Sequence, residues 1–168
     1  TREKVGIYPV ERFDERVNSL WNKTKDICPV SVARTEEFLN WRFVEHPTVK
    51  YSKFIFQDSS DEILAYLVLK IYTKGDEMKG HIVDMLCING KDIVKKLLSY
   101  SYNYFIERGI KNLSCWASED SFYAQVLKQA GFVRKEFETY FGIRIFDRED
   151  RLVKNVGQIG NWRLTMCD

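Results

Sequence analysis

The segment from His81 to Phe132 constrains the fold of this chain more than any other. Its pattern predicts a strand to Ile88, a tight turn, a long helix, a short strand and a short helix that ends before Gly131-Phe132. A parallel strand–helix–strand unit leaves a turn and a helix N-terminus at the carboxyl end of its first strand. Free N–H groups and the helix dipole favour anions there, so the segment predicts an α/β fold with a place for a phosphate-bearing ligand.

The preceding residues predict two helices and then a β-hairpin. Apolar residues recur at three- and four-residue steps from Phe13 to Ile27, and Thr35 can cap a second helix that stops before His46-Pro47. Further helices are expected from the turn to residue 108 and over 121–130, and the polar residues 147–160 are expected to form a solvated loop. Strands are expected over 5–10, 51–57, 63–72, 81–88, 112–117, 136–146 and 162–166.

Size and composition fit one globular domain. Of the 168 residues, 45% are hydrophobic and 30% are charged, and the net charge of +2 is too small to favour a specific nucleic acid. No apolar run approaches the roughly 18 residues of a membrane span, and no signal peptide is recognisable. The four cysteines form no C-x-x-C pair, which argues against a zinc site and fits a reducing compartment, so we expect a cytoplasmic protein. Because the first residue is not Met, we expect residues 1–168 to be a single domain excised from a longer chain.

The spacing of a few residues resembles a known family. A Leu97-Leu98 pair lies in the long helix, Gly109 closes that helix eleven residues after the second Leu, and the last helix ends in Gly131-Phe132. Together with the order of elements, these features resemble the GNAT superfamily of acyl-CoA-dependent N-acyltransferases over nearly the whole chain. The resemblance implies a mixed α/β (α+β) fold, in which a six- to seven-stranded sheet carries helices on both faces.

The resemblance also implies a co-substrate, acetyl-CoA or another acyl-CoA, bound where two parallel strands separate. Its pantetheine arm would pair with the open backbone of the 81–88 strand, at Leu86, Cys87 and Ile88. Its pyrophosphate would meet backbone N–H groups of the turn and the first helical turn, whose residues are Asn89, Gly90, Lys91, Asp92 and Ile93.

The turn departs from the family pattern, Q/R-x-x-G-x-G/A. The two glycines should fall at positions 91 and 93, where this chain has Lys91 and Ile93, and Ile88 takes the Q/R place. A Cβ limits how closely a phosphate approaches the backbone, although the charge of Lys91 compensates in part. The alternative is an ordinary helix start, in which Asn89 is the N-cap and the Asp92 side chain, three residues later, bonds back to it as in a capping box.

Two residues are candidates for catalysis. Asp84 lies within a predicted buried strand and could act as a base, or it could make a structural hydrogen bond, which a buried carboxylate needs. The tyrosine that often acts as the general acid in the family would fall at Leu127. Tyr123 lies one turn earlier on the same helix face and could reach a similar place. The alternative for Tyr123 is a packed tyrosine at the edge of the core.

Two functions follow. The first is an N-acyltransferase, with acetyl-CoA as the expected donor, that acts on a small-molecule or peptide amine. The second is a catalytically degenerate domain that keeps the fold and serves as a binding or scaffolding half of a larger protein, with a neighbouring domain or a second copy as its partner. The missing glycines at 91 and 93 and the missing tyrosine at 127 motivate the second reading.

Overall fold

One mixed sheet organises the molecule. The computed structural model describes residues 5–88, 90–119, 121–135, 142, 144, 146 and 153–167. The strands are β1 (Gly6–Val10), β2 (Ser52–Gln57), β3 (Ile63–Lys74), β4 (Glu77–Cys87) and β5 (Asn112–Cys115). They lie side by side in the order β1-β2-β3-β4-β5, and every neighbouring pair is antiparallel except the parallel pair β4–β5.

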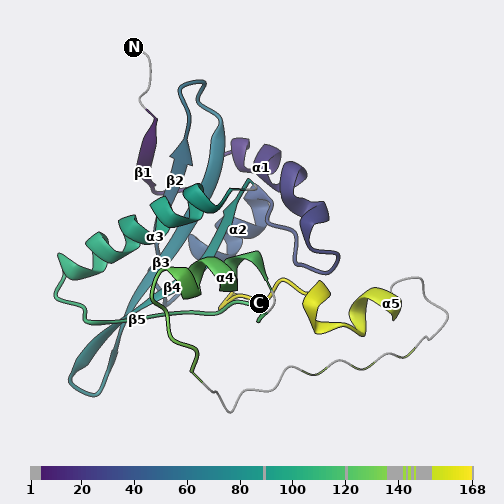
Figure 1. Ribbon diagram of the computed structural model, residues 1–168. Coiled ribbons are helices and arrows are strands. Elements are labelled where there is room, and N and C mark those ends of the chain that lie inside the picture. Colours follow the sequence, from purple (N-terminus) through teal and green to yellow (C-terminus); the bar gives the residue numbers. More distant parts are fainter. Residues whose placement is uncertain are drawn as a thin grey trace.

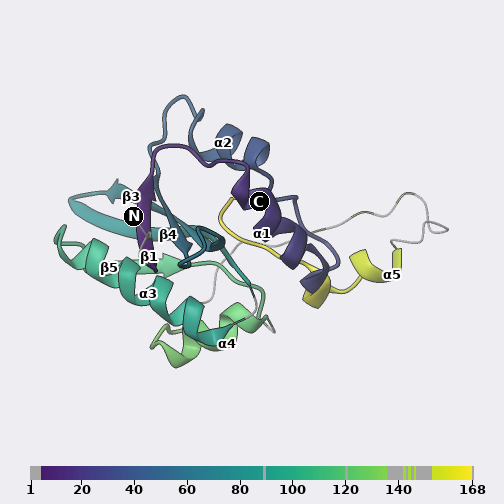
Figure 2. The ribbon, with the colours of Figure 1, turned by 90° about the horizontal axis from the view of Figure 1, so that it is seen from above.

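Helices cover both faces of this sheet. The longer ones are α1 (Arg16–Thr24), α2 (Glu36–Phe43), α3 (Lys91–Ile106) and α4 (Phe122–Gln129); the short ones are η1 (Lys25–Ile27), α5 (Val153–Val156) and η2 (Ile159–Asn161). In Figures 1 and 2, α3 and α4 lie on one face of the sheet and α1 and α2 on the other. The predicted cap of α2 is confirmed, because the Thr35 hydroxyl accepts a hydrogen bond from the N–H of Phe38 at 3.3 Å.

Each face of the sheet has its own hydrophobic core. Leu97 and Leu98 of α3 are buried against Leu67 and Met85 in one core, which also includes Val126 of α4. The other core contains side chains of α1, α2 and the opposite sheet face, namely Val17, Leu20, Leu39, Phe43, Tyr66, Val68, Val83 and Leu86. Gly109 follows α3 with a φ of 72°, the left-handed conformation that its predicted helix-closing role requires.

The strands β4 and β5 separate part-way along β4. Their last paired residues are Ile82 and Cys115, whereas β4 continues to Cys87. On the other edge of β4, Val68 pairs with Asp84 and Leu69 with Ile82, so Val83 is an extra residue and forms a bulge. A bulge bends its strand, and this one lies where β4 leaves β5.

The sheet differs from the predicted one at its C-terminal end. The fold class and the helices on both faces are confirmed, but the described residues form five strands rather than six or seven. Residues 136–146 lie mostly outside the described part of the chain. The strand predicted over 162–166 is wrong: the described residues there form no strand, Trp162 forms an isolated parallel bridge with Val30, and the N–H of Arg163 donates to the Val30 carbonyl at 2.9 Å. The predicted loop 147–160 contains the short helix α5 and part of η2, and no described helix is long and apolar enough to cross a membrane.

Gly80 of β4 provides a test of the packing under α3. A Cβ at this position would lie 2.7 Å from the ring of Phe105, which is buried in the core. Gly80→Ala is therefore expected to lower the free energy of unfolding by about 1–3 kcal/mol, because the ring must shift in a close-packed interior. Chemical denaturation measures this loss. Gly160→Ala is the control, since a Cβ there meets nothing within 4 Å, and equal stabilities of the two variants would contradict the packing.

Candidate functional site

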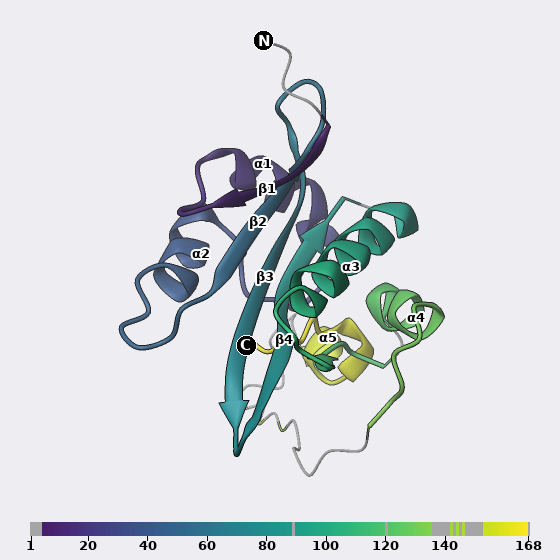
Figure 3. The same cartoon turned by 90° about the vertical axis from the view of Figure 1, so that its left-hand side faces the viewer.

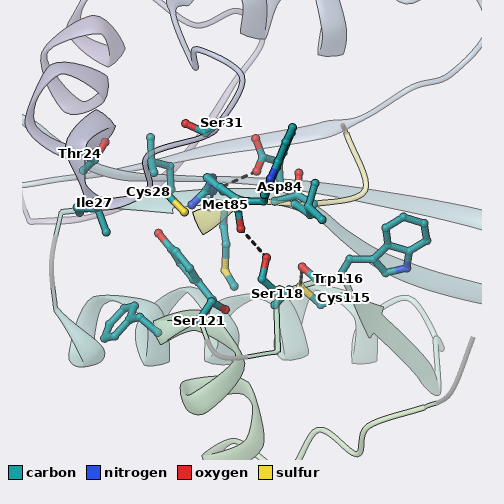
Figure 4. A pocket seen from close by; sticks show the side chains of 18 of the residues that line it. Thr24, Ile27, Cys28, Ser31, Asp84, Met85, Cys115, Trp116, Ser118 and Ser121 are labelled. Atoms are coloured by element: carbon teal, nitrogen blue, oxygen red, sulfur yellow. Dashed lines mark hydrogen bonds and ion pairs between the residues drawn. The ribbon is translucent and has the colours of Figure 1, made fainter. Parts of the chain in front are cut away.

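A cavity of about 300 Å³ lies where β4 and β5 separate. Figure 4 shows Cys28 and Ser31 on one side of it, Ser118 and Ser121 on the other, and Asp84 with Met85 between them. The segment 160–165 and the start of α4 also line it. The cavity thus lies between the α1 side and the α4 side of the molecule, at the place where the sequence predicts a ligand.

Side chains of the same chain already contact the open edge of β4. The Cys87 N–H donates to the hydroxyl of Tyr123 at 3.1 Å, and the guanidinium of Arg163 donates to the Met85 carbonyl. The N–H of Ile88 donates to the Leu64 carbonyl of the neighbouring strand at 3.0 Å. The strands do diverge as predicted, but the expectation of unpaired amides at Cys87 and Ile88 is corrected, because each has a partner.

The N-terminus of α3 lies next to this edge. Gly90 occupies the N-cap position, and Asn89, for which the sequence predicts a capping box with Asp92, lies outside the described residues. Lys91 and Asp92 are exposed in the first turn, and Ile93 is half-buried. Gly90 has a φ of 175°, and a Cβ there would meet Ile93 only at 3.7 Å, so this glycine is not required by the backbone or by close packing.

Asp84 is fully buried in a network of cations and a hydroxyl. Its Oδ2 accepts from Arg34 Nε at 2.9 Å and from the Tyr66 hydroxyl at 2.6 Å, and its Oδ1 lies 3.3 Å from the Arg163 guanidinium. Burial by itself raises the pKa of Asp84, but the charges of Arg34 and Arg163 and the hydrogen bonds outweigh it and hold the pKa below its usual value. Both oxygens of this carboxylate are engaged, and these contacts favour the structural reading of Asp84 over the base.

Stability should depend on pH through this carboxylate. The pKa of Asp84 is lower in the folded chain than the value of about 3.9 expected after unfolding, so its stabilisation is complete above that pH and is lost as the pH falls through the folded value. Denaturation of wild type and Asp84→Asn should therefore give a difference in stability that shrinks below about pH 4. A difference that stays constant into strong acid would contradict the charged state assigned to Asp84.

Tyr123 reaches the cavity from the first turn of α4. Its hydroxyl contacts both the N–H and, at 3.6 Å, the Sγ of Cys87. Burial raises the pKa of Tyr123 to about 12, although the charge of Arg163 opposes the shift. The hydroxyl is thus protonated at neutral pH, and because its oxygen accepts the Cys87 N–H, its own proton remains available to a further acceptor.

Arg163 is the main residue of the site that the sequence did not indicate. Its side chain is 10% exposed, its guanidinium lies 5.0 Å from the centre of the Tyr123 ring, and it lines the cavity. Its Nε is buried with no hydrogen-bond partner among the described residues. A buried N–H without a partner is costly, so an acceptor atom on a guest in this cavity would be stabilised there.

The structure brings Asp84, Cys87, Tyr123 and Arg163 into one region, and Leu127 lies in the core instead. Arg163 and Arg34 were missed because each meets Asp84 across a long stretch of sequence. Asp84 itself indicated that such partners exist, since a buried carboxylate in an apolar strand requires a cation or a hydrogen-bond donor from another part of the chain.

Solved structures share this architecture. An aminoglycoside 6'-N-acetyltransferase from Acinetobacter haemolyticus is 14% identical, with a TM-score of 0.56 over 83% of this chain and 99% of that one. An aminoglycoside acetyltransferase from an uncultured soil metagenomic sample, solved with sisomicin, is 14% identical with a TM-score of 0.59 over 83% and 96%. An aminoglycoside 6'-N-acetyltransferase from Acinetobacter baumannii is 15% identical with a TM-score of 0.54 over 83% and 98%.

The chain has the GNAT fold. No family model matches the sequence, and no curated protein sequence matches it. At such low identities the likeness to the GNAT structures concerns the fold.

Proposed function

We propose that this GNAT domain is an N-acyltransferase that takes acetyl-CoA as its donor and acts on an amine. The observation that carries the proposal is the continuation of β4 from Ile82 to Cys87 after β5 has left it, beside a cavity and the start of α3. When bound, acetyl-CoA supplies an activated acyl group. The Nε of Arg163, which has no partner in the described part of the chain, offers a hydrogen bond to a carbonyl oxygen of such a guest, and the N-terminus of α3 offers backbone N–H groups to its phosphates.

Tyr123 is the proposed acid of the reaction. Its hydroxyl is protonated at neutral pH and lies on the β4 edge at Cys87, where it could give a proton to a departing thiolate. Asp84 is proposed to fix Arg163 rather than to remove a proton, because its two oxygens are held by Arg34, Tyr66 and Arg163. A pantetheine arm along this edge has to replace two hydrogen bonds, from the Arg163 guanidinium to the Met85 carbonyl and from the Cys87 N–H to the Tyr123 hydroxyl. The guanidinium and the hydroxyl are on rotatable side chains, so both can move aside.

Release of free thiol from acetyl-CoA tests the proposal. We expect thiol release to require an added amine, and mass spectrometry should find that amine heavier by one acetyl group. Arg163→Gln should weaken acetyl-CoA binding in calorimetry, since the cavity loses its buried cation. No heat of binding with millimolar CoA or acetyl-CoA would contradict the proposal.

A degenerate binding domain is the second candidate, and one observation favours it. The groups that would hold a pantetheine arm, the Met85 carbonyl and the Cys87 N–H, are already satisfied by the chain's own side chains. This candidate predicts no acetyl transfer to any amine, and turnover by the isolated domain would refute it.

A further inference from the structure

A second, larger cavity opens on the α1/α2 side of the sheet, near the β3–β4 hairpin. Its volume is about 610 Å³, and we call it the basic groove. In Figure 3 the hairpin extends past α2, and no described helix covers this part of the sheet. The groove is lined by Arg42, Tyr51, Lys70, Tyr72, Lys74, Lys79, His81, Val83, Asn112, Leu113, Ser114, Trp116, Lys135 and Met166.

The charge of the groove is one-sided. Five of its lining residues are Lys or Arg, and no Asp or Glu is among the described residues that line it. Among the described residues, one lining lysine makes an ion pair, Lys79 with Glu77 at 3.3 Å, and the Glu77 side chain is 66% exposed, so this pair neutralises little of the charge. Lys70 lies opposite His81 across β3 and β4, on the same part of the sheet as Lys79.

Two stacked rings line the floor of the groove. The His81 ring stacks on Tyr72 with centroids 4.2 Å apart and planes 9° apart, and its Nδ1 lies 2.6 Å from the Ser114 hydroxyl. Burial lowers the pKa of His81 and the charge of Lys70 lowers it further, so the ring is neutral at neutral pH. The cations around it are therefore lysines and Arg42, and the floor offers a polar edge and two ring faces to a guest.

The basic groove leads to the candidate site. Val83 and Trp116 line both cavities, and Val83 is the bulged residue at which β4 leaves β5. A molecule in the groove thus lies next to the region where the acyl group would be presented. This is the position that an acceptor for the transfer needs.

We propose that the basic groove is the acceptor site and that it takes a small-molecule amine that carries phosphate. This inference rests on the proposed acetyl transfer. Several lysine ammonium groups around a neutral floor attract a multiply charged anion, and lysine serves as a point charge for phosphate. The same groups repel polycations, so the aminoglycoside acceptors of the enzymes that share this fold are a poor match for this chain.

Matched amines test the proposal. Glucosamine 6-phosphate and glucosamine differ only in the phosphate, and we expect kcat/KM with acetyl-CoA to be about tenfold or more higher for the first at low salt, with the advantage falling as salt rises. Lys70→Gln combined with Lys79→Gln should abolish the advantage of the phosphorylated amine. Lys25→Gln combined with Lys128→Gln is the control, because both lysines are exposed and neither lines the basic groove or the candidate site.

The outcomes separate this inference from the proposed function. Equal kcat/KM for the two amines, or a higher value for sisomicin, would overturn the phosphate assignment while acetyl transfer stands. If calorimetry shows that glucosamine 6-phosphate binds in a way that depends on Lys70 and Lys79 but no acetyl transfer occurs, the result would support phosphate recognition by the basic groove and contradict the proposed acetyl transfer. Absence of binding at millimolar glucosamine 6-phosphate would overturn the inference.

Discussion

Replacement of Tyr123 by phenylalanine is expected to lower kcat for acetyl transfer by about 10²–10⁴-fold, the usual contribution of a positioned acid. The variant keeps the ring that packs beside Arg163 and removes only the hydroxyl at Cys87. The buried Cys87 N–H then loses the partner that it has in the present structure, which costs about 1–3 kcal/mol. Stopped-time assays of thiol release, with acetyl-CoA and amine both saturating, measure the effect.

A matched tyrosine separates chemistry from stability. Tyr102 donates its hydroxyl to the Ala130 carbonyl at 2.9 Å, away from the cavity. Tyr102→Phe also loses one hydrogen bond of a partly buried tyrosine, so its stability should change as much as that of Tyr123→Phe while its kcat stays at the wild-type value. If Tyr123→Phe also keeps the wild-type kcat, Tyr123 is not the acid.

Asp84→Asn is expected to lower the free energy of unfolding at neutral pH by about 3–5 kcal/mol. The change removes the carboxylate that Arg34 and Arg163 share, and the side chains of these arginines are 0% and 10% exposed. An amide keeps the shape of the side chain but cannot balance either charge. Urea denaturation followed by circular dichroism measures the loss.

The control for this variant is Asp61→Asn. Asp61 pairs with Arg16 on the surface, where its side chain is 52% exposed, and such pairs contribute about 0–1 kcal/mol. Its φ of 65° is tolerated by asparagine as well as by aspartate, so the backbone is not disturbed. Similar losses for Asp61→Asn and Asp84→Asn would mean that the buried network does not carry the stability assigned to it.

Local patterns were sufficient to predict most of the fold. Thr35 caps α2, the Leu97-Leu98 pair faces the core, and Gly109 ends the α3 region in a left-handed conformation, and each of these depends on neighbours within a few residues. The strand over 162–166 was predicted by the same reasoning and is wrong. The alternation of Trp162, Leu164 and Met166 resembles a strand, but the backbone there pairs with Val30 rather than with the sheet.

The candidate site could be predicted only in part. The carboxyl end of β4 and the start of α3 follow from the order of elements, and Asp84 and Tyr123 were singled out for their chemistry. Arg163 and the basic groove were not, because the residues that meet there come from segments far apart in the chain, such as Lys70, His81 and Ser114. Positive and negative residues are interleaved along the sequence, whose net charge is +2, so the sequence does not indicate that lysines gather on one surface of the fold.

The central claim is that an acyl-CoA lies along β4 where β5 has left it. Titration of isotope-labelled protein with acetyl-CoA, followed by amide NMR, tests it most directly. We predict saturable shifts of the Cys87 amide and of the first-turn amides Lys91 to Ile93, while the amides of β1, at the far edge of the sheet, stay in place. Unchanged Cys87 and first-turn amides at millimolar acetyl-CoA would contradict the account.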